Sequence, residues 1–316
     1  MGHGIVPFGI GSDGGGSIRI PCNYTGLFGL KPSHGRVSKS PMPGTNSVTV
    51  RGPLASSMAD LGLLYRVLAQ PNPSSWPSSH FAPPKAHRGP RNKVLGIYNA
   101  WFDRADPLVQ EACRSALEYM QRDLGYEIVD ISLPLLREGQ LSHAMTILAE
   151  QVVGVKGSIY DLTPSNRILM SVARQTPATD FLLAQRVRTI LMEHLAYLFQ
   201  KHPGLVIVTP TTPNAGWPIE EADLACGMSN ANMTLKNMEY VWLANFTGLP
   251  CIQFPVGYVD GIKGSGKVPI GLSGQGEWGS EDALIDFGYD GEAWLNHGLE
   301  GGKPMPEGWV DVLRRS

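Results

Sequence analysis

Three consecutive glycines, Gly14 to Gly16, constrain this chain more than any other feature of its sequence. They lie between Asp13 and Ser17 in the segment PFGIGSDGGGSIRIPCNYTG, residues 7–26, called the glycine segment below. Glycine loses more backbone freedom on folding than any other residue, so a run of three is costly to order. Such a run therefore needs a structural or chemical reason.

Three known glycine-rich motifs fail to explain the segment. The dinucleotide fingerprint GxGxxG fits residues 9–14, but Pro21 falls where its helix should run and no acidic residue follows at the required distance. A phosphate loop needs Gly-Lys-Ser/Thr at its end, whereas Ser17 is followed by Ile18. A nucleophile elbow needs a glycine two residues after its serine, and Arg19 occupies that position. A glycine-rich turn with a purely structural role remains as the alternative without chemistry.

The segment does fit the surroundings of a serine nucleophile. Successive backbone N–H groups of a glycine-rich loop can converge on one point, because no Cβ blocks them and positive φ is accessible. A hydroxyl in the same loop, here that of Ser17, then lies beside an oxyanion hole. Asp13 and Arg19 flank the loop six residues apart. We expect them to form a buried ion pair that supports it, the alternative being an ordinary surface pair.

The composition is that of an ordinary globular protein. The 316 residues are 42% hydrophobic and 17% charged, which allows one large domain or two modest ones. A net charge of −2 gives no electrostatic reason to expect nucleic acid or an anionic membrane as partner. No His, Cys and Asp cluster has ligand spacing, so no metal is expected and no cofactor is implied. The four cysteines lie far apart and no apolar run could span a bilayer, so we expect reduced thiols and a cytoplasmic location.

Hydrophobic periodicity divides the rest of the chain into helices and strands. Residues 71–91 contain six prolines and four serines and are predicted to form a surface loop. A strand at 93–98, a helix at 106–124 and a strand at 126–131 make a βαβ unit, which implies parallel strands. The other predicted elements are helices from 57, over 181–199, over 237–244 and from 280, and strands at 205–208, 251–254 and 269–272, with no helix between 5 and 51. The predicted fold class is α/β, with a mostly parallel or mixed central sheet sandwiched by helices.

Two adjoining blocks carry a specific pattern: residues 11–21, GSDGGGSIRIP, and residues 26–38, GLFGLKPSHGRVS. Weaker blocks follow at residues 52–55, 208–211, 244–250, 255–257 and 269–272. In this order they resemble the amidase signature family. Gly14 departs from the family, which usually carries Ile or Thr there, and so does Ser33-His34, where Thr and an aromatic residue are more usual. The resemblance implies a single amidase-like domain over residues 1–316.

This resemblance implies hydrolysis of a carboxamide C–N bond through a serine acyl-enzyme, using a Ser–Ser–Lys triad without histidine. Ser17 would be the catalytic acyl nucleophile. The backbone amides of Gly14, Gly15, Gly16 and Ser17 would form the oxyanion hole. In the family, a lysine of lowered pKa acts as the base and a bridging serine relays the proton.

Both of those groups belong, in the family, to parts of the chain upstream of the glycine segment. Here the sixteen residues before Ser17 contain no lysine, and Ser12 is their single serine. We therefore expect the chain to be the C-terminal portion of an amidase, lacking the N-terminal segment and inactive as it stands. Lys31 and His34 are the nearest substitutes for the base, but neither has that role in the family's blocks.

Two other functions are compatible with the same residues. The chain could be a catalytically silent module that binds amides or another protein, or the amidase subunit of a tRNA-dependent amidotransferase. The expected ligand is a small-molecule amide, with loops at 134–180 and 213–236 lining its acyl pocket. Self-association into a homo-oligomer is also open, because missing segments would leave apolar surface and a strand edge uncovered.

Overall fold

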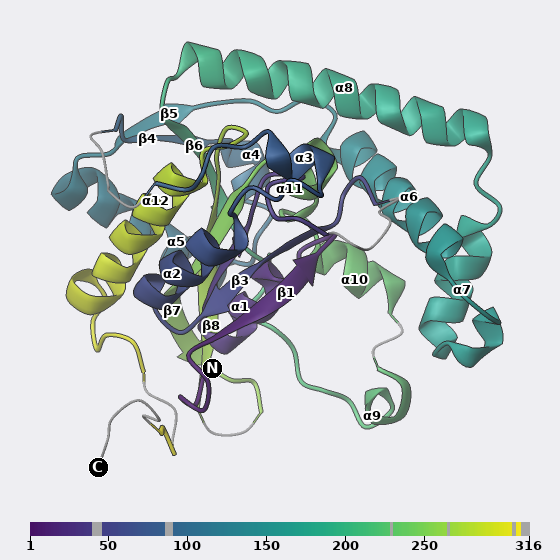
Figure 1. Ribbon diagram of the computed structural model, residues 1–316. Coiled ribbons are helices and arrows are strands. Elements are labelled where there is room, and N and C mark those ends of the chain that lie inside the picture. The colour runs from purple at the N-terminus through teal and green to yellow at the C-terminus, as the bar shows by residue number, and fades with distance from the viewer. Residues whose placement is uncertain (40–45, 86–90, 228–229, 264–265, 305–307, 311–316) are drawn as a thin grey trace.

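A computed structural model describes residues 1–39, 46–85, 91–227, 230–263, 266–304 and 308–310 of the chain (Figure 1). Its strands are β1 (Phe8–Asp13), β2 (Phe28–Lys31), β3 (Val50–Ala55), β4 (Val94–Ile97), β5 (Glu127–Asp130), β6 (Leu205–Pro210), β7 (Cys251–Asp260) and β8 (Lys267–Gln275). Its helices are α1 (Arg19–Thr25), α2 (Met58–Leu68), α3 (Trp76–Ser79), α4 (Asn99–Phe102), α5 (Pro107–Leu124), α6 (Leu136–Gly154), α7 (Pro164–Ala173), α8 (Ala178–Lys201), α9 (Asp223–Cys226), α10 (Ala231–Asn237), α11 (Trp242–Thr247) and α12 (Glu281–Ala293). A 3-10 helix, η1 (Ile159–Asp161), and a π-helix, η2 (Trp294–Gly298), complete the described elements.

The strands form an eight-stranded sheet in the order β1-β3-β2-β7-β8-β6-β4-β5. β4 pairs in parallel with β5 and with β6, and the other neighbouring strands run antiparallel. The predicted α/β class is confirmed, with a mixed sheet, and so is the parallel unit built from β4, α5 and β5. The parallel strands lie at one end of the sheet, and β1, which leads into the three glycines, lies at the other.

Local sequence signals account for the helix ends that were predicted. Ser57 caps α2, and its hydroxyl oxygen accepts a hydrogen bond from the Asp60 amide at 3.2 Å. α5 begins at Pro107, whose fixed φ suits the first helical position. It ends at Gly125, which has the left-handed φ of 71° that glycine adopts without strain.

Several segments differ from the prediction. α1 lies where no helix was expected, and Pro21 is its third residue, a position whose amide has no intrahelical partner to lose. α6 and α7 occupy much of 134–180, which was predicted to be a loop. The helix predicted over 237–244 is divided between the end of α10 and α11. The surface loop at 71–91 contains the short α3, and its residues 86–90 lie outside the described part.

The face that α6 buries explains why its helical pattern is hidden in the sequence. Ser142, His143, Thr146 and Glu150 are all buried, and successive members of this set are one, three and four residues apart. That spacing places them on one side of a helix. Because these side chains are polar, a search for apolar periodicity finds no helix there.

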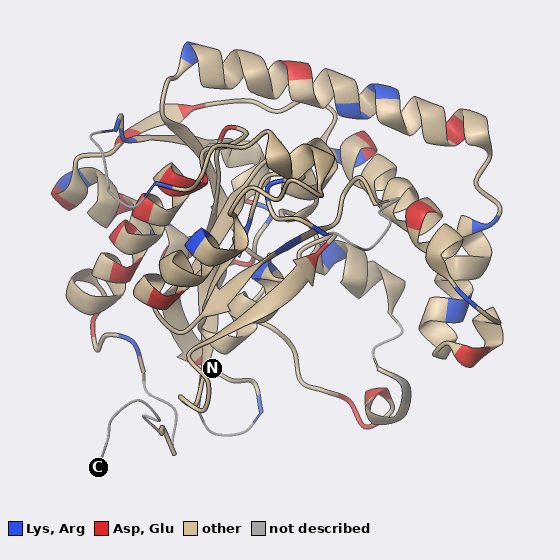
Figure 2. Ribbon diagram, in the orientation of Figure 1, with Lys and Arg blue, Asp and Glu red and all other residues tan. Residues whose placement is uncertain are grey.

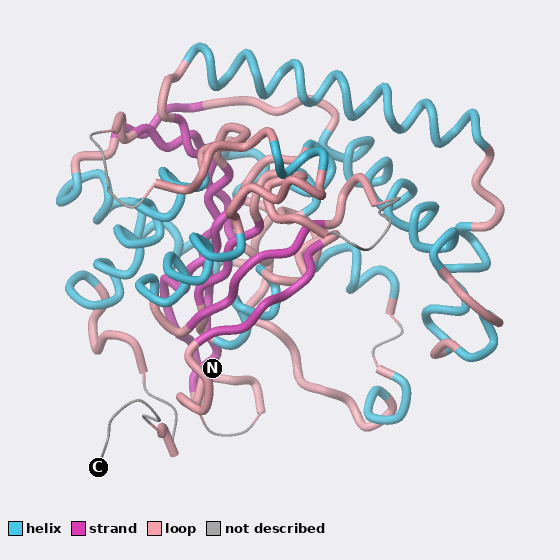
Figure 3. The backbone as a smooth tube through the Cα atoms, in the orientation of Figure 1, coloured by secondary structure: helices cyan, strands magenta, loops and turns pink. Residues whose placement is uncertain are grey.

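Helices cover both faces at the centre of the sheet (Figure 3). On one face Gly288 and Gly291 let α12 approach Ile252 and Phe254 of β7 closely. Alternation along the strand points Gln253 to the opposite face, where α1 packs against β7 and β8. Every residue of β6 is buried, as its continuous apolar sequence predicted.

Charged residues are spread over helices and loops, and they include a row of acidic residues along α12 (Figure 2). Within the described residues, no helix combines the length and the apolar character needed to cross a membrane. The fully buried ionisable residues include Asp13 and Arg19 within the glycine segment and Lys31 shortly after it. Burying a charge costs free energy unless the charge is paired, so these side chains need specific partners in the folded protein.

Self-association through β1 is the first prediction. β1 pairs with β3 alone among the described strands, and its outward-facing Phe8 and Ile10 are 43% and 59% exposed. An uncovered edge strand with an apolar face favours edge-to-edge pairing. We expect the chain to be oligomeric or poorly soluble, and Ile10→Lys to shift it toward monomer in sedimentation velocity. Val67→Lys, a similarly exposed site on α2, is the control and should leave the distribution unchanged. A wild-type chain that sediments as a monomer would contradict the prediction.

Candidate active site

A buried ion pair closes the base of the glycine segment. Asp13 is the last residue of β1 and Arg19 is the first residue of α1, and both side chains are fully buried. Arg19 Nε donates to Asp13 Oδ2 at 3.1 Å, and Arg19 Nη2 donates to Asp13 Oδ1 at 3.1 Å. This two-point contact confirms the predicted pair, and it ties the end of a strand to the start of a helix across the residues between them.

The same carboxylate also holds the backbone of the loop. Asp13 Oδ1 accepts a hydrogen bond from the Gly16 amide at 2.8 Å, and Oδ2 accepts one from the Ile18 amide at 3.1 Å. Gly16 has φ of 103°, and a Cβ there would lie 2.7 Å from side-chain atoms of Ile20 and Val241. This position therefore requires glycine both for its conformation and for its space.

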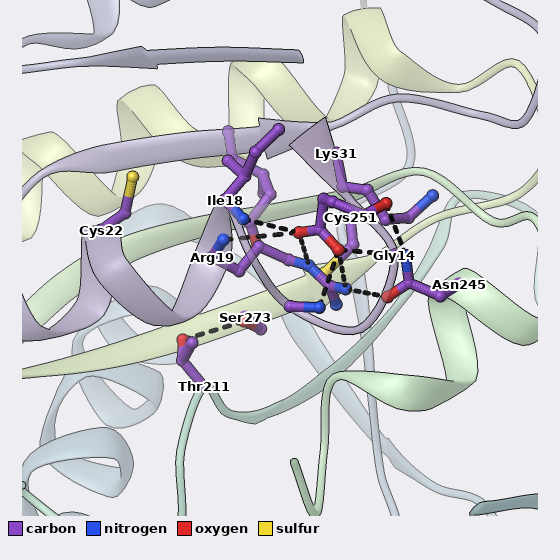
Figure 4. A network of polar contacts seen from close by, with 12 residues as sticks. Gly14, Ile18, Arg19, Cys22, Lys31, Thr211, Asn245, Cys251 and Ser273 are labelled. Atoms are coloured by element: carbon purple, nitrogen blue, oxygen red, sulfur yellow. Dashed lines mark hydrogen bonds and ion pairs between the residues drawn. The ribbon is translucent and has the colours of Figure 1, made fainter. Parts of the chain in front are cut away.

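Asn245 of α11 completes the support from the far side of the loop (Figure 4). Its Nδ2 lies 3.0 Å from each of three acceptors: the Asp13 carbonyl, Asp13 Oδ1 and the Val48 carbonyl. Its Oδ1 accepts a hydrogen bond from Arg19 Nη2. Sequence reasoning had placed Asn245 in a family block without giving it a role. A polar residue in a helix whose other residues are largely apolar was the signal available.

The electrostatics of the pair follow from this enclosure. Burial by itself would raise the pKa of Asp13, but the charge of Arg19 and its hydrogen bonds outweigh burial and hold that pKa well below its usual value. Burial would likewise lower the pKa of Arg19, and the Asp13 carboxylate overcomes it in the other direction. Both groups are therefore charged at neutral pH, and each is the main compensation for the other.

Lys31, the last residue of β2, is a third buried charged residue beside this pair. Its Nζ donates to the Pro32 carbonyl at 2.8 Å. Burial, followed by repulsion from Arg19, lowers the pKa of Lys31 to about 7. The structure shows no hydrogen bond between Lys31 and Ser17 among the described residues, so it does not bring this alternative base to the serine.

Ser17, the predicted nucleophile, is exposed on the outer side of the loop. Within the described part of the chain, its hydroxyl makes no hydrogen bond, and the amides of Gly14, Gly15 and Ser17 donate none. The Gly16 amide is used differently, because it donates to Asp13. The amides left for a predicted oxyanion hole are therefore those of Gly14, Gly15 and Ser17.

A histidine that sequence reasoning did not single out contacts the loop. His143 of α6 is fully buried, and its Nε2 lies 2.8 Å from the Gly14 carbonyl oxygen. Nothing in the local sequence distinguishes it, because it lies within the segment taken for a loop. Only the packing of α6 against the glycine segment brings the two together.

An apolar cavity of about 570 Å³ lies at the other end of α1, beyond Tyr24. Its lining includes residues 215–219, from a loop predicted to form the acyl pocket, but none from 134–180. Ser17 is not among the lining residues, so the use of this cavity for an acyl group stays a prediction. No cluster of metal-ligating side chains is present in the described residues.

The sequence and the fold both resemble those of known proteins. The family model described as Amidase matches residues 1–285. A fatty acid amide hydrolase of Medicago truncatula is 30% identical over 90% of this chain and 48% of its own length. A glutamyl-tRNA(Gln) amidotransferase subunit of Thermus thermophilus is 28% identical over 89% of this chain and 63% of its own length. A crystal structure of the corresponding Thermotoga maritima protein superposes with a TM-score of 0.77 at 20% identity, covering 97% of this chain and 66% of that one.

The mixed sheet and its glycine loop place the chain among α/β proteins with the amidase fold. The chain belongs to the amidase family, as its resemblance in sequence predicted. It spans 48% and 63% of the lengths of the two curated relatives described above.

The ion pair predicts a large effect of Asp13→Ala on stability. Removing one partner leaves the Arg19 charge buried and unpaired, which typically costs about 3–5 kcal/mol, and it also releases the Gly16 and Ile18 amides. The free energy of unfolding, measured by urea denaturation, should fall by about this amount in Asp13→Ala. Asp260→Ala removes an ion pair with Lys267 in which the Asp260 side chain is 86% exposed, and should cost less than about 1 kcal/mol. Equal losses in the two variants would show that the Asp13 pair does not support the fold.

Lys31 predicts a pH dependence of stability. Its folded pKa of about 7 lies below the ordinary value of 10.5, so between these pH values the unfolded chain binds more protons than the folded one. The free energy of unfolding must then rise with pH, by up to about 1.4 kcal/mol per pH unit. The free energy of unfolding of wild type minus that of Lys31→Met should therefore increase from pH 7 to pH 10. A difference that stays flat between pH 7 and pH 10 would rule out a lowered pKa for Lys31.

Proposed function

We propose that this chain carries the nucleophile and the carbonyl-binding loop of an enzyme that hydrolyses a small-molecule carboxamide. The observation that supports this most is the exposed Ser17 beside backbone amides that donate no hydrogen bond within the described residues. The loop that carries them is held by Asp13, Arg19 and Asn245. Backbone N–H groups held rigidly near a hydroxyl can stabilise the oxyanion that forms when that hydroxyl attacks a carbonyl. Membership of the amidase family supports the same reaction.

The proposed chemistry has two halves. Ser17 Oγ bonds to the amide carbon as its proton passes to a base, and the carbonyl oxygen becomes an oxyanion facing the Gly14, Gly15 and Ser17 amides. The C–N bond then breaks, the amine leaves with a proton, and an acyl-enzyme remains. Water attacks that ester, releases the carboxylic acid and restores the Ser17 hydroxyl.

The base is the part of this mechanism that the described residues do not supply. Lys31 Nζ is directed at the Pro32 carbonyl, and His143 Nε2 is directed at the Gly14 carbonyl. We propose that residues 1–316 alone leave Ser17 without a base and are inactive. In the family this task belongs to a lysine and a bridging serine upstream, and the proposed activity of the whole protein depends on such groups.

A second candidate function is that of a subunit in a tRNA-dependent amidotransferase. It is favoured by the similarity to the Thermus thermophilus amidotransferase protein. Such a subunit would use the same serine chemistry but would need partner subunits. A catalytically silent amide-binding module is the remaining alternative, and a location in the cytoplasm stays a prediction for all three.

Reaction of Ser17 with a fluorophosphonate probe tests the proposal. We expect no labelling of residues 1–316, because a serine hydroxyl is a weak nucleophile without an adjacent base. If the gene continues upstream in frame with a lysine and a Gly/Ser-rich stretch, the extended protein should label and hydrolyse small aliphatic or aryl amides. Labelling and turnover should be lost in Ser17→Ala.

Ser12→Ala, at another serine of the same segment, is the matched control and should leave labelling of the extended protein intact. Label that persists in Ser17→Ala would overturn the assignment of the nucleophile. Ser17-dependent labelling of residues 1–316 would show that these residues contain a base after all, and Lys31 and His34 would be the first to substitute.

A further inference from the structure

We propose that His143 is a positioning residue that sets the orientation of the Gly14–Gly15 peptide and so aims the Gly15 N–H away from α6, toward the side on which a substrate carbonyl would bind. This inference rests on the proposed function for its catalytic consequence. The orientation of the peptide itself can be tested without activity.

The contact is specific and enclosed. His143 Nε2 lies 2.8 Å from the Gly14 carbonyl oxygen, within the range of a good N–H···O bond. The ring meets Phe246 of α11 edge to face, with centroids 6.2 Å apart and planes at 78°. On its other side, ring atom Cε1 would lie 3.3 Å from a Cβ on Gly15. The imidazole is thus held between α11 and the loop, with little freedom to turn away.

Glycine on both sides makes this hydrogen bond necessary. Rotating a peptide plane changes ψ of the residue before it and φ of the residue after it, and most side chains forbid one of the two orientations. Gly14 and Gly15 forbid neither, so steric exclusion does not choose between them. In a trans peptide the C=O and the following N–H point in opposite directions. Fixing the Gly14 carbonyl on His143 therefore turns the Gly15 N–H away from α6.

The protonation state of His143 suits a donor. Burial lowers the pKa of His143 to about 4. The hydrogen bond to Gly14 and the Asp13 charge raise this pKa, the Arg19 and Arg188 charges lower it, and burial outweighs them, so the ring is neutral at pH 7. Nδ1 has no hydrogen-bond partner among the described residues. Because Nε2 faces a carbonyl, which can only accept, the neutral ring must carry its proton on Nε2. That proton is engaged with Gly14, which leaves His143 as a support of the loop and not as the base for Ser17.

Three variants separate positioning from packing. His143→Leu fills much of the space without a donor, and His143→Gln restores an N–H donor near the position of Nε2. Thr146→Val is the control, since Thr146 is also fully buried on α6 but its hydroxyl bonds to Ser142 of α6 and Gln185 of α8. Any effect of disturbing this face of α6 should appear in Thr146→Val as well.

The direct readout is an NMR spectrum of residues 1–316 that carry Ile10→Lys to limit self-association and are labelled with glycine bearing 13C at its carbonyl and 15N at its amide. An experiment that detects only 13C–15N peptide bonds then reports three Gly–Gly peptides, namely 14–15, 15–16 and 301–302. We expect the 14–15 signal to move or split in His143→Leu, to return in His143→Gln and to stay in Thr146→Val. The 301–302 signal serves as the internal reference.

The second readout is the rate of Ser17 phosphonylation in the extended protein. Misdirecting one oxyanion donor should slow it by about 10- to 100-fold in His143→Leu, less than the complete loss of a donor, with recovery in His143→Gln. A 14–15 signal and a rate that match those of Thr146→Val would overturn the proposal, and a moved signal with an unchanged rate would overturn its catalytic part. If neither the extended protein nor any of its variants reacts with the fluorophosphonate probe, the proposed function fails. The NMR result alone then decides whether His143 orients the Gly14–Gly15 peptide.

Discussion

The buried ion pair between Asp13 and Arg19 is the interaction on which the proposed site depends. It joins the end of β1 to the start of α1, and the same carboxylate binds the Gly16 and Ile18 amides. A loop of three glycines has no side chains of its own to pack, so its shape must come from its surroundings. Desolvation makes such a pair costly by itself, and the additional hydrogen bonds from the loop and from Asn245 are what offset that cost here.

The support of the loop is shared among elements far apart in the chain. Asn245 binds it from α11 and His143 from α6, while Lys31 lies buried nearby at the end of β2. The inner side of the loop is therefore filled, and its outer side, with Ser17, is open. This asymmetry is what a carbonyl-binding loop needs, because fixed donors must face a site that a ligand can enter.

The parts of the fold that were predictable had strong local signals. The capping residues Ser57 and Asp60 predicted the start of α2, and Pro107 and Gly125 marked the two ends of α5. The continuous apolar sequence of β6 predicted a strand buried on both faces. The elements that were missed have sequences without a recognisable local pattern, and they form because of how they pack in the fold. α6 buries a polar face, so its periodicity is invisible on a hydrophobic scale, and α1 is too short and too near the glycines to show a pattern. The helix predicted over 237–244 is likewise divided between α10 and α11.

The sequence by itself determined the α/β class through its hydrophobic periodicity. It also determined the amidase family and the Asp13–Arg19 pair, because the glycine segment is contiguous and its residues constrain one another over a few positions. The tertiary structure decided which amides of that segment are still available, since Gly16 is occupied by Asp13 and the Gly14 carbonyl by His143. It also decided that Asn245, 232 residues along the chain from Asp13, completes the clamp. Hydrogen bonds between distant residues depend on how helices pack against the sheet, and local sequence patterns do not encode that packing.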